Sequence, residues 1–191
     1  TVDWVSALNY FMQMRRTLQE RRDLLERTLK VAQATSYVTG LANTLQALGD
    51  LSVRVAELEP ARRYYDRAVK LYEEIDDRLG LANTLMSMGD MFIGQKQWSE
   101  AVVHYDKALI LARAVQDRLG IANILVDRGR AVFELSRHEE GFENLKEAIE
   151  LFHAVQNPRW ANIAQQRLNE LQRRLNGGGV VDEQESPEAM L

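Results

Sequence analysis

A block of forty residues occurs three times in this chain, and this repetition constrains the fold more than any other feature. The motif Gly-Leu-Ala-Asn-Thr-Leu begins at Gly40 and again at Gly80, and a third copy, Gly-Ile-Ala-Asn-Ile-Leu, begins at Gly120. A period of about 20–50 residues is typical of solenoids, in which each unit buries its apolar face against its neighbours. We therefore predict an array of similar units that presents surfaces to other molecules.

Composition excludes several other classes of protein. The 191 residues suit one domain, and the absence of cysteine rules out disulfides, thiolate metal sites and a catalytic thiol. The histidines are scattered, so we expect no metal site, and we expect no cofactor. No apolar run approaches the roughly 18–20 residues of a membrane span and nothing resembles a signal peptide, so we expect a cytoplasmic protein without membrane insertion. The chain begins with Thr1 rather than Met, which suggests a piece of a longer protein.

The net charge of −4 comes from the C-terminal end of the chain. Four acidic residues and no basic ones lie in the last fifteen residues, and the remainder carries 24 acidic and 24 basic residues. A balanced body lacks the basic stripe that phosphate backbones require, so nucleic acid is not an expected partner. The paired acids Glu73-Glu74 and Glu139-Glu140 fall on polar faces or helix ends, and we therefore predict no enzyme activity.

Each block contains two apolar stripes with helical spacing. In the second block one stripe comprises Leu85, Met88, Gly89 and Phe92, and the other comprises Ala101, Tyr105, Ala108 and Ala112. We predict a pair of helices joined by a short turn. Ser99 is the expected N-cap of the second helix, behind the hydrophobic staple residue Trp98, and Asp117 and Asn157 are the expected N-caps of later helices.

An aliphatic residue, a glycine, an alanine, an aromatic residue and a second alanine recur in a fixed order and spacing. These residues are Leu45, Gly49, Ala61, Tyr65 and Ala68, then Leu85, Gly89, Ala101, Tyr105 and Ala108, then, less closely, Leu125, Gly129, Gly141, Leu145 and Ala148. The pattern resembles the tetratricopeptide repeat (TPR) family. The forty-residue length is similar to the long-repeat branch of kinesin light chains, spindle-orientation adaptors and the sensor arms of bacterial signalling ATPases, and it implies a longer second helix in each pair.

The resemblance implies an all-α fold, a right-handed α-solenoid of about four TPR helix pairs plus a C-terminal capping helix. We expect a TPR domain over 1–176, with a degenerate first pair at 1–39, repeats at 40–79, 80–119 and 120–158, and a capping helix at 159–176. This arrangement comprises nine helices. Residues 177–191 are expected to form a glycine hinge and an acidic tail, which is a candidate for docking on its own groove or on a neighbouring molecule.

In stacked helix pairs of this kind the first helix lines the concave side, and a second stripe on these helices forms the candidate peptide-binding groove. Its residues are Asn43, Gln46, Asp50 and Arg54, then Asn83, Met86, Ser87 and Asp90, then Asn123, Val126, Asp127 and Arg130, with Asn162 in the capping helix. The asparagine amides offer both a donor and an acceptor to a peptide backbone. The alternative is that each asparagine braces the neighbouring repeat, and both interpretations stay open.

The predicted function is a protein–protein interaction module, a scaffold that binds a peptide or partner segment in the groove, as part of a larger bacterial regulatory or signalling assembly. The alternative is a structural oligomerisation unit that self-associates without an outside peptide. The carboxylate clamp of chaperone-binding relatives needs basic concave residues, whereas this chain places Asp50, Asp90 and Asp127 there. A chaperone C-terminus is therefore not the expected ligand.

Overall fold

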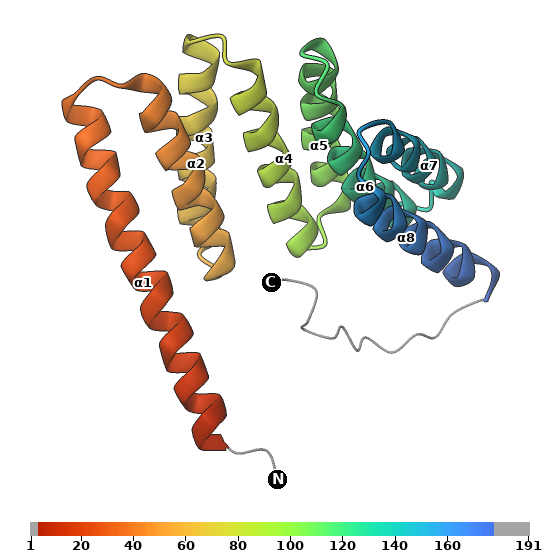
Figure 1. The fold of residues 1–191 in the computed structure, drawn as a ribbon, viewed down its shortest axis with the longest axis horizontal. Coiled ribbons are helices and arrows are strands. Elements are labelled where there is room, and N and C mark those ends of the chain that lie inside the picture. Colours follow the sequence, from red (N-terminus) through yellow and green to blue (C-terminus); the bar gives the residue numbers. More distant parts are fainter. Residues whose placement is uncertain (1–3, 178–191) are drawn as a thin grey trace.

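The structure, a computed structural model, describes residues 4–177, with side chains from residue 17 onward. Within these residues the chain forms eight α-helices and no strand, which confirms the predicted all-α solenoid of helix pairs (Figure 1). The helices are α1 (Trp4–Ala34), α2 (Val38–Arg54), α3 (Leu58–Glu74), α4 (Arg78–Gly94), α5 (Trp98–Ala114), α6 (Arg118–Glu134), α7 (His138–Ala154) and α8 (Pro158–Asn176).

Three helix pairs make up the centre of the molecule. Helix α2 packs on α3, α4 on α5 and α6 on α7, while α1 covers α2 at one end and α8 covers α7 at the other. Both helices of the α4–α5 pair contain 17 residues, as do those of the other two pairs. The expectation of a longer second helix is therefore wrong, because the two helices of each repeat share its length equally.

The seven turns between helices share one conformation. Each turn has three residues, and its middle residue has a left-handed backbone with φ between 51 and 62°. The residue after it closes the helix end with a backbone hydrogen bond, as when the Asp117 N–H donates to the Ala112 carbonyl at 3.0 Å. None of the seven is a glycine; they are Ser36, Ala56, Asp76, Lys96, Gln116, Ser136 and Gln156. This constant turn is what keeps the repeats in register.

The apolar stripes form the core, and the glycines mark where two helices approach most closely. Tyr65 and Tyr105 are buried, and their rings lie directly over Gly49 and Gly89. A Cβ atom added at Gly89 would lie 2.5 Å from Tyr105 Cε1. The two helices of the second repeat therefore cross tightly at Gly89, and the group that fills the crossing is the tyrosine ring.

The prediction of nine helices is wrong at the N-terminal end of the described residues. Helix α1 is continuous over 31 residues, where a degenerate helix pair was expected. Residues 4–34 contain no glycine and no proline, so the segment has no residue that would end a helix between the two predicted ones.

The predicted helix starts are partly confirmed. Asp117 accepts a hydrogen bond from the Gly120 N–H, and Asn157 accepts one from the Trp160 N–H. Ser99 is not an N-cap, because α5 already begins at Trp98 and Gln97 occupies the position before it. The common three-residue turn sets that boundary in place of the serine side chain.

The proposed docking of the acidic tail concerns residues 178–191, which lie outside the described residues. Among the helices that are described, none is both long and apolar enough to span a membrane.

Candidate functional site

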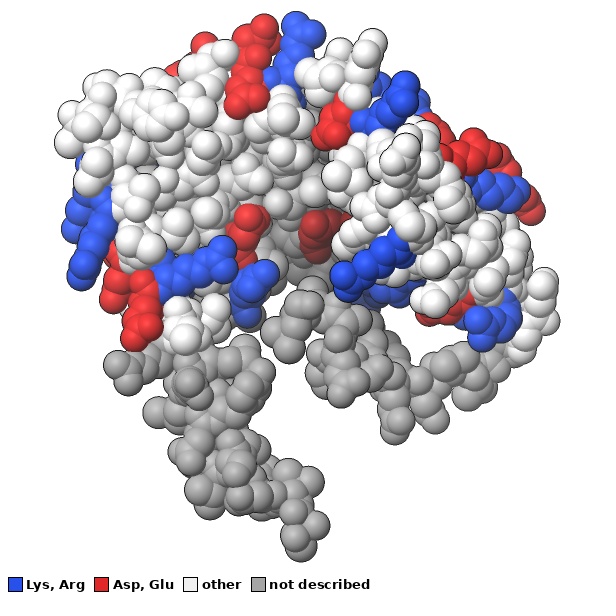
Figure 2. Space-filling model, in the orientation of Figure 1, with Lys and Arg blue, Asp and Glu red and all other residues white. Residues whose placement is uncertain are grey.

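The first helices of the three pairs line a concave face. Helices α2, α4 and α6 contact one another in sequence, whereas the second helices α3, α5 and α7 have no comparable contact with each other. A row of helix pairs that touches more closely along one side curves toward that side. Figure 2 shows acidic side chains on the floor of a hollow at the centre of the molecule. We call the surface formed by α2, α4 and α6 the concave groove.

Two tyrosine–aspartate pairs build the floor of the concave groove. Tyr65 Oη donates a hydrogen bond of 2.7 Å to Asp50, and Tyr105 Oη donates one of 2.6 Å to Asp90. Burial and the adjacent carboxylates raise the pKa of both tyrosines, so their hydroxyls remain protonated donors. Each pair ties the inner helix of a repeat to its outer helix and fixes the direction of the carboxylate.

The third repeat replaces both members of this pair. Leu145 stands where Tyr65 and Tyr105 stand, and Arg130 takes the place of Asp50 and Asp90. The Arg130 guanidinium lies 5.8 Å from the centre of the Trp98 ring, a cation–π contact that places a positive charge at the α5–α6 junction. The joint loss of Tyr and Asp indicates that the two residues act as one unit.

A third carboxylate, Asp127 of α6, lies next to the second pair. Burial and the charge of Asp90 raise the pKa of Asp127 to about 7, and Arg130 and Arg167 oppose this rise. Burial also raises the pKa of Asp90, while the Tyr105 hydrogen bond lowers it. Asp90 is exposed in the groove and can therefore be reached by a ligand. Asp127 accepts no hydrogen bond from another described residue.

The predicted asparagine row divides into two kinds of position. Asn43 accepts a hydrogen bond of 2.5 Å from Tyr72 Oη. Gln46 accepts hydrogen bonds from the hydroxyls of Tyr72 and Thr84. In the first repeat these amides therefore brace the packing between α2, α3 and α4. Asn83 and Asn123 are half-buried and make no hydrogen bond with another described residue. At these two positions the amide is available to a ligand.

The other predicted groove residues are less uniform. Met86 and Val126 are half-buried and pack against the core, so they act as packing residues. Ser87 lies beside the Tyr65 hydroxyl and contributes to lowering its pKa. Arg54, at the end of α2, and Asn162, on α8, are both exposed. Arg54 makes no ion pair with another described residue, which leaves its charge available at the rim.

Sequence reasoning missed the groove residues contributed by other helices. Tyr65 and Tyr105 come from the outer helices and were expected only as core residues, although a tyrosine in place of phenylalanine at the aromatic position was a signal for a hydroxyl partner. Arg167 of α8, whose charge acts on Asp127, left no signal in the repeat pattern because α8 is not part of a pair.

A separate cavity lies between α5, α6 and α7. Its volume is about 400 Å³, and it is lined by Asp106, Leu109, Ile110, Arg113, Leu125, Arg128 and Asn144. Asn144 is only 8% exposed, and its Nδ2 makes no hydrogen bond with a described residue. The equivalent positions carry the larger side chains Tyr64 and His104, so the cavity is specific to this repeat boundary.

Comparison with known proteins finds a family match for part of the chain and a similar fold in solved structures. No curated protein sequence matches it. Among solved structures, the N-terminal domain of stress-induced protein-1 (STI-1) from C. elegans is 18% identical with a TM-score of 0.54, over 67% of this chain and 97% of that one. BtubC (BKLC) from P. vanneervenii is 15% identical with a TM-score of 0.60, over 100% of this chain and 86% of that one. At these identities the likeness shows the fold alone.

The family match covers the second and third repeats, from α4 to α7. Residues 80–154 match the family model described as tetratricopeptide repeat. The helix pairs and the turn geometry that recurs between them agree with this match. Residues 80–154 are therefore identified as tetratricopeptide repeats.

Proposed function

We propose that this chain binds a partner protein by holding a segment with basic side chains in the concave groove. Tetratricopeptide repeats are generally protein–protein interaction modules, and residues 80–154 carry that repeat. The observation that carries the proposal is Asp127, a half-buried carboxylate on which the charge of Asp90 acts and which accepts no hydrogen bond from any described residue.

Two carboxylates in a partly desolvated groove destabilise each other, and a bound cation relieves that repulsion. A lysine or arginine between Asp90 and Asp127 would restore the solvation that both groups lost and would interact with both charges. Asp50 extends the acidic floor into the first repeat, where its own charge acts on Asp90. Arg130 and Arg167 already offset part of the negative charge, so the groove favours a segment with few positive charges at defined positions.

The neutral polar residues of the groove suit an extended backbone. The half-buried amides of Asn83 and Asn123 each offer a donor and an acceptor that no described residue uses. They occupy the same position in adjacent repeats, so they can bond to two points of one partner segment. The hydroxyls of Tyr65 and Tyr105 hold Asp50 and Asp90 in place before the ligand arrives, which reduces the entropic cost of binding.

Binding to matched peptides tests this proposal. A fluorescent twelve-residue peptide with two lysines would be titrated against the protein, beside the same peptide with glutamate or glutamine at both positions. We expect the lysine peptide to bind most tightly and its affinity to fall at high salt. Asp90→Asn and Asp127→Asn should each weaken binding about tenfold or more, whereas Asp66→Asn on the outer face of α3 should not change it. Equal affinity of all three peptides, or full binding by both groove variants, would overturn the proposal.

The wider context of the interaction rests on the sequence resemblance. The junction Asp-Arg-Leu-Gly before each Ala-Asn, present at Asp77 and Asp117, is similar to that of bacterial signalling-ATPase sensor arms. We propose on this basis that the groove works within a bacterial regulatory or signalling assembly, and a pull-down from the native host with Asp127→Asn as the control tests it.

A further inference from the structure

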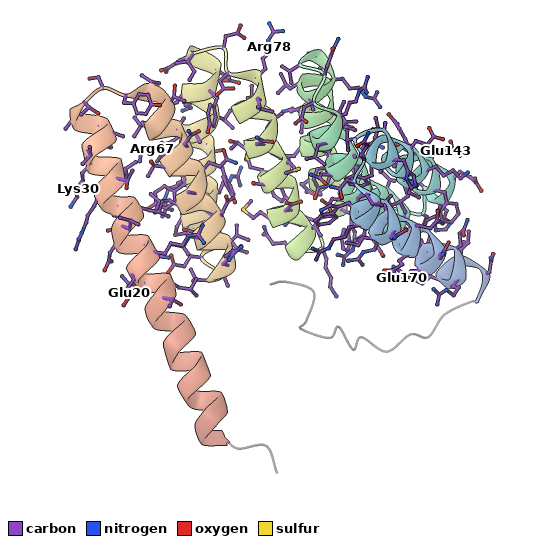
Figure 3. All side chains as sticks on the ribbon, viewed as in Figure 1. Glu20, Lys30, Arg67, Arg78, Glu143 and Glu170 are labelled. Atoms are coloured by element: carbon purple, nitrogen blue, oxygen red, sulfur yellow. The ribbon has the colours of Figure 1, made fainter. Side chains whose placement is uncertain are left out.

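The cavity between α5, α6 and α7 follows from the curvature of the solenoid. Helix α6 packs on both α5 and α7, whereas α5 and α7 have no comparable contact with each other. Because the row of helix pairs curves toward its inner helices, α5 and α7 diverge and leave a gap whose floor is α6. Its volume of about 400 Å³ lies within the usual range of ligand pockets, roughly 300–1,000 Å³. Figure 3 labels Glu143, the residue before Asn144 on α7.

A largely buried arginine lines the floor of this cavity. Arg128 of α6 occupies the position of Leu48 and Met88, which are core residues in the first two repeats. Its side chain is only 12% exposed, and its guanidinium pairs with Asp106 at 2.6 Å and with Glu140 at 2.8 Å. A position that is apolar in the other repeats has therefore become a polar wall, and that wall already has its ionic partners.

The charged groups around the cavity balance one another. Arg113 pairs with Glu147 at 2.8 Å, and Arg137 pairs with Glu140 at 2.6 Å. Together with the pairs of Arg128, this set contains three positive and three negative side chains: Arg113, Arg128, Arg137, Asp106, Glu140 and Glu147. An ionised ligand would lose its hydration here without meeting an unpaired opposite charge, which is unfavourable. The cavity is therefore suited to a neutral ligand.

Asn144 supplies a polar group that no ion pair or hydrogen bond uses. It is 8% exposed, and no described residue bonds to its amide. Tyr64 and His104 hold this position in the other two repeats, so the shorter asparagine both opens the space and places an amide in it. An amide has a donor end and an acceptor end, and rotation about its Cβ–Cγ bond turns either end toward the cavity. The group that matches both ends is a second amide.

The rest of the wall is aliphatic. Leu109 and Leu125 are buried, and Ile110 lies at the rim with 70% of its surface exposed. The positions equivalent to Ile110 carry the charged residues Lys70 and Glu150. At this repeat boundary alone, among the three repeats, an isoleucine extends the apolar wall from the interior to the surface. A ligand with an aliphatic part would remove that wall from water.

We propose that this cavity binds a small neutral molecule that carries a carboxamide on a short branched aliphatic chain. The carboxamide pairs with the amide of Asn144, and the aliphatic chain lies against Leu109, Leu125 and Ile110. The ion pairs of Arg113 and Arg128 form the sides of the site and keep their present partners. Water molecules could bond to the Asn144 amide, but they would leave the aliphatic wall hydrated, whereas a ligand with both parts satisfies the amide and covers the wall.

Three probes with one carbon skeleton test the chemistry of the site: isocaproamide, isocaproate and isohexylamine. Each would be titrated against the full chain, with NMR following the side-chain amide of Asn144 and the methyl groups of Ile110. We expect saturable shifts with isocaproamide and binding about tenfold or more tighter than that of either charged probe, because only the amide is neutral and matches Asn144. Added salt should leave this affinity unchanged, since a neutral probe has no charge to screen.

Variants of the lining residues test the position of the site. Asn144→Leu removes the amide and fills the space, so the Ile110 methyl shifts should report isocaproamide binding that is weaker by about tenfold or more. Ile110→Lys introduces the residue of the first repeat and should weaken binding several-fold, as followed at the Asn144 amide. Gln172→Leu also replaces an amide by leucine, at an exposed position of α8, and should bind as wild type does. Circular dichroism and the Tm establish that each variant is folded.

The outcomes that would overturn the proposal are specific. They are equal affinity for the three probes, no saturable shift with isocaproamide, or binding by Asn144→Leu as tight as that of wild type. The cavity shares no lining residue with the acidic floor of the concave groove. A failure here therefore leaves the peptide-binding proposal standing, and a failure of the lysine peptide to bind leaves this one standing.

Discussion

The Tyr105 hydroxyl donates a hydrogen bond of 2.6 Å to Asp90, fifteen residues earlier in the chain. The same ring covers Gly89, so one side chain both fills the helix crossing and orients a carboxylate in the concave groove. Tyr65 makes the equivalent bond to Asp50 in the preceding repeat, over the same fifteen residues. The core of each repeat and its groove are therefore built by one residue, and a change there affects stability and binding together.

Tyr105→Phe removes the hydrogen bond and keeps the ring. We expect the free energy of unfolding to fall by about 0.5–1.5 kcal/mol, the usual net value of such a bond. The pKa of Asp90 should rise further, because the Tyr105 hydrogen bond now lowers it. Chemical denaturation measures the first effect and a carboxyl NMR titration the second. Tyr37→Phe is the control, since Tyr37 is 61% exposed. Equal losses in the two variants would contradict the structural role of the hydroxyl.

Gly89→Ala tests the closeness of the helix crossing. The added methyl group would overlap the Tyr105 ring, so we expect a loss of about 1–3 kcal/mol through overpacking. Gly94→Ala is the matched control, because a Cβ there meets no atom within 4 Å. In the control the better helix propensity of alanine should stabilise the protein by up to about 1 kcal/mol. Opposite signs of the two effects in thermal unfolding are expected, and a shared sign would show that the crossing is open.

Asp127→Asn tests the buried charge of the concave groove through its pH dependence. The pKa of Asp127 is raised to about 7 in the folded chain. In the unfolded chain an aspartate titrates near its usual value of about 3.9. The folded state therefore holds a proton that the unfolded state releases between about pH 4 and pH 7, and stability from this group is lost as the pH rises through that window.

The variant should remove this loss. Asp127→Asn should match wild type near pH 4 and exceed its free energy of unfolding by up to about 4 kcal/mol at pH 8, because each unit by which the pKa is raised corresponds to about 1.4 kcal/mol. Urea denaturation at a series of pH values provides the comparison, with Asp66→Asn as an exposed control. A constant difference between variant and wild type across this range would show that Asp127 is ionised normally. Binding of a lysine peptide should show the reverse trend and tighten as the pH rises through about 7, because the carboxylates must be ionised to attract it.

Asn144→Leu tests the unpaired amide at the α5–α7 cavity. The Nδ2 atom is buried and donates no hydrogen bond to a described residue. Replacing the amide therefore removes a buried polar group whose loss of hydration no hydrogen bond offsets. Leucine also adds apolar contact with Leu109 and Leu125, which line the same cavity. The control is Asn162→Leu, an exposed position at which the same substitution changes helix propensity alone. We expect Asn144→Leu to raise the free energy of unfolding by about 1 kcal/mol or more beyond the change in this control. A loss of stability would indicate that an ordered water satisfies the amide.

Local pattern was sufficient for much of this fold. The forty-residue period and the spacing of residues such as Leu85 and Ala101 predicted the helix pairs and their buried faces, because helical periodicity is a property of neighbouring residues. Asp117 and Asn157 were correctly predicted as N-caps for the same reason. Ser99 was wrongly predicted as an N-cap. The turn before α5 depends on the left-handed backbone of Lys96, and because Lys96 is not a glycine the sequence gives no sign of that conformation.

What the sequence determined by itself is the repeating helical unit and the face that each helix buries, since these follow from residues within one turn or one period of each other. Only the tertiary structure decided that Asn43 is a brace bonded to Tyr72 and that the charge of Asp90 of α4 acts on Asp127 of α6. Those relationships join side chains from different helices, and the free energy of each depends on burial and on a partner tens of residues away. Periodicity carries no information about either.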